Sequence, residues 1–243
     1  MRYTRSMKQL KASGAGMNHF DKFRPYIESA SRIVFDSIKL RGLTFNTLNN
    51  LYRFFLTQLP PFGEEEFHCA PGCGYCCHLR VSISVAEALI ILDYLREHDL
   101  QHQYEERVNT LRESLAQRAV SDNSWWLENS VPCLFLEQKT VSCTIYEVRP
   151  FTCRAYHSLD VQRCETGFFN RAETAIPCYP DFKRSRELYS VAFELALAEL
   201  GLQSAQFELS STIGLFLQSP DLVHQWAQGR RVLPSILRES GPS

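Results

Sequence analysis

Four cysteines fall within nine residues of this chain, in the stretch CAPGCGYCCHLR at positions 69–80. Two of them, Cys76 and Cys77, are adjacent, and neighbouring side chains of an extended segment point to opposite sides. Both can reach one centre only if the backbone bends, and Gly72 and Gly74 stand where such a bend needs glycine. The cluster is compatible with an iron–sulfur centre, a zinc ion or a pair of disulfides.

Disulfides are the least favoured of these interpretations. The chain has 243 residues, of which 44% are hydrophobic, so it can bury a core without crosslinks. Its basic N-terminal stretch, residues 1–17, leads into no apolar h-region, and no run of 18 apolar residues occurs. We therefore expect a cytoplasmic protein without a membrane partner, whose nine cysteines act as ligands or redox groups rather than disulfides. The net charge of −1 gives no electrostatic footprint for nucleic acid.

All nine cysteines lie between positions 69 and 178, and the flanking segments read as helices. Gly42 and Gly201 are placed as helix stops, and Ser84 followed by Glu87 has the form of a capping box. Apolar residues recur at helical spacing, which predicts helices through residues 20–38, 48–59, 88–95, 104–115, 188–198, 207–216 and 222–226.

The middle of the chain follows a different pattern. Residues 133–146 read as two short extended runs around a polar turn, which predicts a small hairpin carrying Cys133 and Cys143. Residues 149–183 have little periodicity and predict an irregular loop. We expect a mainly α protein: a helical domain with a small β-hairpin and an irregular cysteine-rich metal-binding centre. Its three parts are a helical segment 1–68, a cysteine-cluster metal-binding domain 69–180, and a helical segment 181–243 packing on the same core.

A thiolate is a soft anionic ligand, and closely spaced cysteines can turn toward one metal. The two-residue gap between Cys73 and Cys76 is used by zinc knuckles and iron–sulfur loops alike, so it indicates a metal site without identifying the metal. Cys178 is expected to be a bystander. The other eight suffice for two four-cysteine sites or for one site with further thiols: Cys69, Cys73, Cys76, Cys77, Cys133, Cys143, Cys153 and Cys164.

Two arginines flank one of the later cysteines. Arg149 and Arg154 stand on either side of Cys153, where a cation would lower a thiol pKa and offset the negative charge of a thiolate-bound metal. We expect both to support the metal from outside its ligand shell. Histidines near the cysteines could complete a mixed ligand set, although the cysteines are already sufficient: His68, His78 and His157.

Together with the later segment CLFLEQKTVSCTIYEVRPFTCRAY at 133–156, the first cluster resembles the bacterial CxxCxxCC cysteine-cluster family, described as a zinc- or iron-chelating domain. The resemblance spans about residues 69–164 and implies that the eight cysteines bind metal. It also singles out Tyr146, Arg149 and Pro150, followed by Cys153 and Arg154. The first gap here has three residues where the family name implies two. A related cysteine-rich segment occurs in flagellin lysine N-methylases, which carry an iron–sulfur cluster, and this favours an iron–sulfur cluster over zinc.

Three other interpretations use the same residues. Cys69, Cys73 and Cys76 match the C-x3-C-x2-C loop of radical S-adenosylmethionine enzymes, but those enzymes place it after the first strand of a parallel β/α barrel, and the sequence predicts no such alternation. A zinc-stabilised interaction module would be closed and redox-inert. A thiol oxidoreductase would use the adjacent Cys76 and Cys77. Our expectation is metal chelation with a redox or electron-transfer role, and the sequence leaves open whether the protein is an enzyme.

Overall fold

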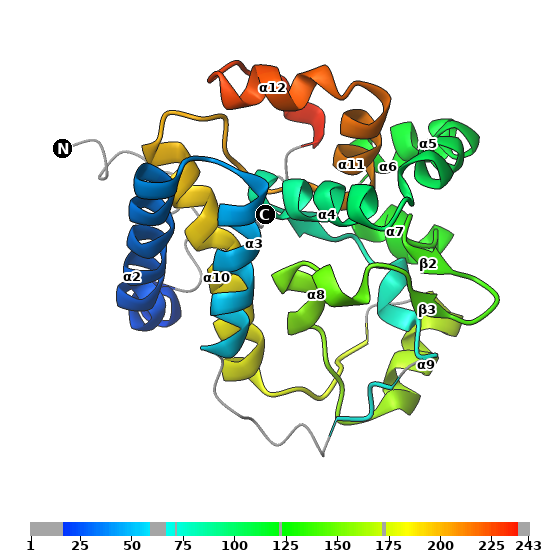
Figure 1. The fold of residues 1–243 in the computed structure, drawn as a ribbon. Helices are drawn as coiled ribbons and strands as arrows, with labels where there is room; N and C mark the ends of the chain where they lie inside the picture. The colour runs from blue at the N-terminus through cyan, green and yellow to red at the C-terminus, as the bar shows by residue number, and fades with distance from the viewer. Residues whose placement is uncertain (1–16, 59–66, 71, 122, 172–173, 238–243) are drawn as a thin grey trace.

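The computed structural model describes residues 17–58, 67–70, 72–121, 123–171 and 174–237, and it is mainly helical, as predicted (Figure 1). The helices are α2 (Met17–Arg41), α3 (Phe45–Thr57), α4 (Val85–Glu97), α5 (Gln101–Thr110), α6 (Arg112–Val120), α7 (Asn123–Asn129), α8 (Phe151–Ala155), α9 (Val161–Asn170), α10 (Pro180–Glu199), α11 (Leu209–Gln218) and α12 (Asp221–Ala227), with the 3-10 helices η2 (Tyr75–His78), η3 (Tyr146–Val148) and η4 (Ser235–Leu237).

Three long helices, α2, α3 and α10, lie side by side on one side of the molecule (Figure 1). The apolar stripe predicted for α2 is buried, including Val34 and Ile38. Gly42 follows the helix with φ +83°, and its N–H donates to the Ile38 carbonyl at 2.8 Å, so the predicted stop is confirmed. The predicted continuation of α3 to position 59, and the prolines after it, fall outside the described residues.

Helix α4 begins with the predicted capping box. The Ser84 hydroxyl accepts from the Glu87 N–H at 3.3 Å, and the Glu87 carboxylate accepts from the Ser84 N–H at 2.8 Å. The same carboxylate accepts from the Phe151 N–H at 2.9 Å and from the Ser190 hydroxyl, so it joins α4 to α8 and α10. Glu87 is therefore a buried link between the long helices and the cysteine-bearing segment.

The helix predicted through residues 104–115 is divided at Leu111, so that prediction was wrong on continuity. Both halves, α5 and α6, pack against α11. A Cβ added to Gly214 of α11 would lie 3.3 Å from side-chain carbons of Val108 and Leu115, one from each half. The break at Leu111 allows both helices to contact α11, and the apolar spacing in the sequence continues across it.

Strands are short and antiparallel in the described part of the chain. Strand β1 (Ser82–Ile83) pairs with β4 (Phe207–Glu208), and β2 (Leu136–Glu137) pairs with β3 (Ser142–Cys143), with Leu136 opposite Cys143. The predicted hairpin is confirmed, although Cys133 precedes it rather than lying on a strand. No parallel strands occur among these residues, so the barrel setting of a radical enzyme is missing from them.

The irregular loop predicted for residues 149–183 contains helices α8 and α9 and the first turn of α10, so that prediction was wrong. Helix α8 follows Pro150 and has five residues, while the Asp160 carboxylate caps α9 by accepting from the N–H groups of Gln162 and Arg163. Helix α8 is too short to display a buried apolar stripe, and α9, although ten residues long, has no buried residue, so neither gives the signal that sequence periodicity detects.

One buried cluster draws residues from the beginning, middle and end of the chain, among them Val34, Ile90, Phe151, Phe193 and Trp226. Cys133, Cys143 and Cys153 pack against its edge. Among the residues described, no helix is both long and apolar enough to cross a membrane.

Candidate metal centre

The first cysteine cluster is bent by two successive turns. Gly72 has φ +89°, and the Cys73 N–H donates to the Ala70 carbonyl at 3.0 Å. Residues Tyr75–His78 then form η2, in which the Cys77 N–H donates to the Gly74 carbonyl at 3.0 Å. A 3-10 helix has three residues per turn, so consecutive side chains leave it about 120° apart. The bend that the adjacent cysteines require is present, and it directs Cys76 and Cys77 to different surroundings.

The hairpin β2–β3 packs directly on this loop. A Cβ added to Gly74 would lie 2.5 Å from Val141 Cγ1 in the hairpin turn, which explains the glycine there. The Cys133 N–H donates to the Cys77 carbonyl at 2.7 Å, and the Leu136 N–H donates to the Cys133 carbonyl at 3.1 Å. Backbone contacts therefore bring the hairpin cysteines beside the first cluster.

Four cysteines form what we call the inner group: Cys77, Cys133, Cys143 and Cys153. They come from η2, the segment before β2, β3 and α8. The Cys77 thiol donates to Cys76, which raises the pKa of Cys77, and burial and the charges of Cys133 and Cys143 act in the same direction. Burial raises the pKa of Cys153, and the charges of Cys133, Cys76 and Cys143 add to that shift. These effects couple the inner thiols electrostatically and favour their protonated forms.

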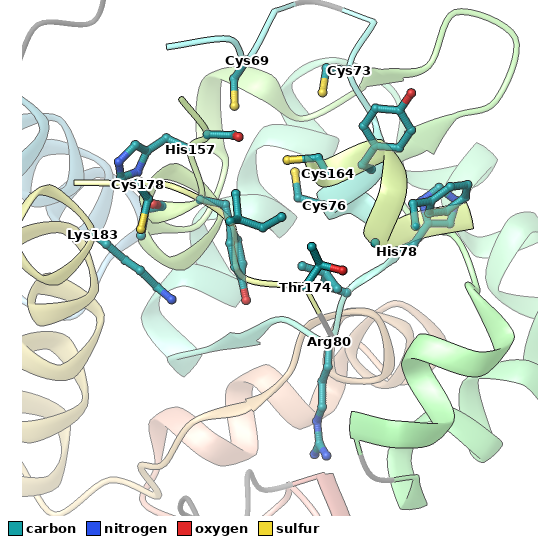
Figure 2. A pocket seen from close by; sticks show the side chains of 18 of the residues that line it. Cys69, Cys73, Cys76, His78, Arg80, His157, Cys164, Thr174, Cys178 and Lys183 are labelled. Atoms are coloured by element: carbon teal, nitrogen blue, oxygen red, sulfur yellow. Dashed lines mark hydrogen bonds between the residues drawn. The ribbon is translucent and has the colours of Figure 1, made fainter. Parts of the chain in front are cut away.

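Four others form what we call the outer group: Cys69, Cys73, Cys76 and Cys164. They line a cavity of about 580 Å³, and Figure 2 shows their sulfurs pointing toward one another. Burial raises the pKa of Cys69, and the charges of Cys76, Cys73 and Cys164 raise it further. Cys164 is held beside η2 because Phe168, one turn later on α9, packs its ring on Tyr75 at 5.5 Å between centroids and on His78 at 4.7 Å.

Cys76 is the point where the two groups meet. The hydrogen bond from Cys77 lowers the pKa of Cys76 to about 7, opposed by burial and assisted by the Arg149 guanidinium. Its charge raises the pKa of Cys73 in the outer group and of Cys143 in the inner group. Cys76 is thus the thiol that the surroundings favour most as a thiolate.

Backbone N–H groups point at several of the sulfurs. The Phe135 N–H donates to Cys133 Sγ at 3.5 Å, and the Ile145 N–H favours the thiolate of Cys143. In the outer group the backbone of Ser158 does the same for Cys69, and that of Tyr75 for Cys73. Such hydrogen bonds stabilise sulfur in its anionic, metal-binding form.

Arg149 and Arg154, the two arginines expected to support the metal, have different surroundings. The guanidinium of Arg149 lies 4.1 Å from the centre of the exposed Tyr146 ring, and it favours the thiolate forms of Cys76, Cys143 and Cys153. Its Nε is buried without a hydrogen-bond partner among the described residues. Arg154 instead donates through its Nη2 to the carbonyls of Tyr146 and Glu147, at 3.2 and 2.7 Å. Arg149 therefore supplies charge to the thiols, while Arg154 braces the backbone that carries Arg149.

Tyr52 on α3 is a supporting residue that sequence reasoning missed. Its hydroxyl donates to the Arg149 carbonyl at 2.6 Å and accepts from Arg154 Nε at 2.7 Å, and burial raises the pKa of Tyr52 to about 12. In the sequence it is one more aromatic residue on an apolar helix stripe. Nothing distinguishes it there from ordinary core.

The histidines and Cys178 lie beside the centre. His157 is buried, with Nε2 accepting from the Tyr179 N–H at 2.7 Å and Nδ1 2.9 Å from the Ala155 carbonyl, so the backbone occupies both ring nitrogens. His78 Nδ1 lies 3.1 Å from the Gly74 carbonyl, and His68 is exposed. Cys178 also lines the cavity, but Figure 2 places its sulfur by Lys183 rather than among the outer four.

None of the nine cysteines forms a disulfide. Within the described ranges, no three Cys, His, Asp or Glu side chains are arranged closely enough to hold a metal ion as they stand. The donor set nevertheless suits zinc or an iron–sulfur cluster, because both are bound by thiolates that hydrogen bonds and nearby cations stabilise. Eight thiols, backbone N–H donors and Arg149 supply these elements.

Comparison with known proteins identifies the cysteine-bearing region. The chain has no significant match among curated proteins or among solved structures. Residues 68–175 match the family model described as "CxxCxxCC: Putative zinc- or iron-chelating domain". The match begins just before Cys69 and extends beyond Cys164, so it includes both cysteine groups. Residues 68–175 are therefore similar to the CxxCxxCC family, which is described as a zinc- or iron-chelating domain.

Proposed function

We propose that this domain binds iron as an iron–sulfur cluster through its cysteine thiolates and serves a redox or electron-transfer role. The observation that carries the proposal is the cavity shared by Cys69, Cys73, Cys76 and Cys164, with the hairpin segment bonded to η2 beside it and with backbone N–H groups and Arg149 favouring the thiolates. When bound, such a cluster supplies one-electron chemistry. A reducing cytoplasm, which we also propose, would keep the thiols available.

The number of thiols favours iron–sulfur over a single structural zinc. One tetrahedral zinc needs four ligands, whereas residues 68–175 contain eight cysteines. We rank Cys73, Cys76, Cys77 and Cys153 first as ligands, followed by Cys69, Cys133, Cys143 and Cys164.

The chain's own residues have distinct tasks in this proposal. Arg149 offsets negative charge at the thiolates, and Tyr52 and Arg154 hold the backbone of Arg149 in place. Backbone N–H groups orient the sulfurs of Cys133 and Cys143.

The second candidate is a zinc-stabilised module. It is favoured by the shortness of the elements that carry the cysteines, since a structural zinc contributes folding energy to such small units. It would be closed, colourless and without redox chemistry.

Anaerobic purification followed by visible spectroscopy and metal analysis distinguishes these candidates. Iron with acid-labile sulfide and a visible absorption band supports the proposal. A colourless protein with stoichiometric zinc would overturn it in favour of the zinc module, and a normally folded metal-free protein would overturn both.

A matched pair of substitutions tests the ligand ranking. Cys76→Ser is expected to lose metal, because it removes the thiol with the lowered pKa at the junction of both groups. Cys178→Ser is expected to keep it. Equal metal content in the two variants would contradict the ranking.

A further inference from the structure

The eight thiols divide into two groups with different surroundings. We propose that they form two separate metal sites: an outer site of Cys69, Cys73, Cys76 and Cys164, and an inner site of Cys77, Cys133, Cys143 and Cys153. The inference rests on the proposed metal binding and adds how the ligands are divided. Each site would have the four thiolates of a tetrahedral zinc or an iron–sulfur cluster.

The outer four are united by the cavity they share. All of them line it, and Figure 2 shows their sulfurs converging from three segments: the loop before η2, η2 itself and α9. The ring of Phe168 on Tyr75 and His78 fixes α9 against η2. Cys164 is thereby brought to a cluster that lies nearly 90 residues earlier in the chain.

The inner four are united by the hairpin and the core. Cys133 is hydrogen-bonded through its backbone to Cys77, and Cys143 lies opposite Leu136 in the β2–β3 pair. Cys133, Cys143 and Cys153 all pack against the main buried cluster. No inner cysteine is among the described residues that line the cavity.

The division falls between two adjacent residues. Successive side chains of η2 leave its axis about 120° apart. Cys76 lines the cavity, while Cys77, whose thiol donates to Cys76, lies on the side of the hairpin segment, where its carbonyl accepts from the Cys133 N–H. Each group also has two sulfurs that accept from backbone N–H groups: Cys69 and Cys73 outside, Cys133 and Cys143 inside. Each group thus has backbone donors that stabilise its own thiolates.

The two sites differ in accessibility, because only the outer cysteines line the cavity. Its volume of about 580 Å³ is in the usual range for a small-molecule site, so a chelator or small ligand can reach the outer thiolates. The inner site lies between the hairpin and α8 against the core. We therefore expect the outer metal to exchange quickly and the inner metal slowly.

Zinc loading of the full-length protein tests the division. The wild type and single variants are loaded with Zn²⁺, desalted and measured for zinc per chain, with circular dichroism to confirm folding. We expect about two zinc ions in the wild type, because each takes four thiolates. Cys69→Ser and Cys164→Ser should each lose about half of the zinc. Cys133→Ser and Cys143→Ser should lose the other half, and Cys178→Ser should lose none.

Release to a chelator provides the second measurement. The wild type should release zinc in a fast and a slow phase of similar amplitude, with the fast phase missing from the outer variants and the slow phase missing from the inner ones. One zinc per wild-type chain, or complete loss in every one of the four variants, would overturn the division and indicate a single shared centre.

The test separates this inference from the proposed function. A protein that carries only zinc when purified, yet shows the two half-losses, contradicts the iron–sulfur proposal and supports two sites. A protein that contains iron and sulfide, but whose outer and inner variants all lose their metal completely, supports the iron–sulfur proposal and contradicts the two separate sites. Two variants in each group guard against a single substitution that merely fails to fold.

Discussion

The long helices and the cysteine centre are held together in different ways. In the helical part, Phe55 stacks on Tyr189 at 4.6 Å and meets Phe193 at 6.0 Å between ring centroids, and the surrounding side chains are buried. The centre is built from two-residue strands, the four-residue η2 and the five-residue α8. Elements of that length are not stable alone. The helices are stabilised by burial, whereas in our proposal the centre, which also buries Phe135, Ile145 and Phe151, depends in addition on metal bound by its thiols.

The largest expected effect comes from removing metal from the loaded protein. Hydrogen exchange should accelerate by at least about 100-fold in residues 72–80 and 133–148, because the binding energy that orders these short elements is lost. Exchange in α4 and α10 should change far less. Equal acceleration of exchange in α10 would show that the helices and the centre unfold as one cooperative unit. It would contradict the proposal that only the centre depends on metal.

Phe193→Ala tests the helical part of the molecule. Phe193 is fully buried, so we expect a loss of about 3–5 kcal/mol in the free energy of unfolding, measured with urea. Zinc per folded chain should stay the same, because Phe193 lies in the buried core and is not one of the proposed ligands. A folded Phe193→Ala protein with half the metal would show that the core directly shapes the centre.

Glu87→Gln tests the link between the regions. The substitution replaces a carboxylate that accepts from the backbone of Ser84 and Phe151, and we expect a cost of roughly 1–3 kcal/mol at neutral pH. Burial raises the pKa of Glu87 in the folded protein. The carboxyl therefore contributes stability at low pH that is lost as pH rises through the folded pKa. The Glu87→Gln protein should lack this loss, and a parallel pH profile in both proteins would contradict the assignment.

The smallest effect is expected from Arg149→Met. Because the guanidinium favours the thiolates of Cys76, Cys143 and Cys153, its removal should raise their pKa values. Protons would then compete better with metal, and the pH midpoint of metal release should rise by about one unit or less. Arg149→Lys keeps the charge, so its pH midpoint of metal release should lie between those of the wild type and Arg149→Met. An unchanged midpoint in Arg149→Met would contradict the role of Arg149 in stabilising the thiolates.

Sequence pattern predicted the helical part better than the centre. The stripe that includes Val34 and the capping box of Ser84 are local signals, and both reappear in the structure. Helix α8 was missed because five residues are too few for periodicity, and α9 was missed because none of its ten residues is buried. The break at Leu111 was hidden by an apolar spacing that continues through it.

The candidate thiols were all recognisable from their spacing, but their grouping was not. It depends on the turn of η2 and on the packing of Phe168, neither of which is encoded in cysteine spacing. Tyr52 was missed for a related reason, since its hydroxyl acts on Arg149 from nearly 100 residues away.

The central claim is that cysteine thiolates of this domain hold the metal. X-ray absorption spectroscopy at the metal edge of the loaded full-length protein tests it most directly. The account predicts a first shell composed of sulfur alone, at about 2.3 Å from the metal. A first shell dominated by nitrogen or oxygen at about 2.0–2.2 Å would contradict it.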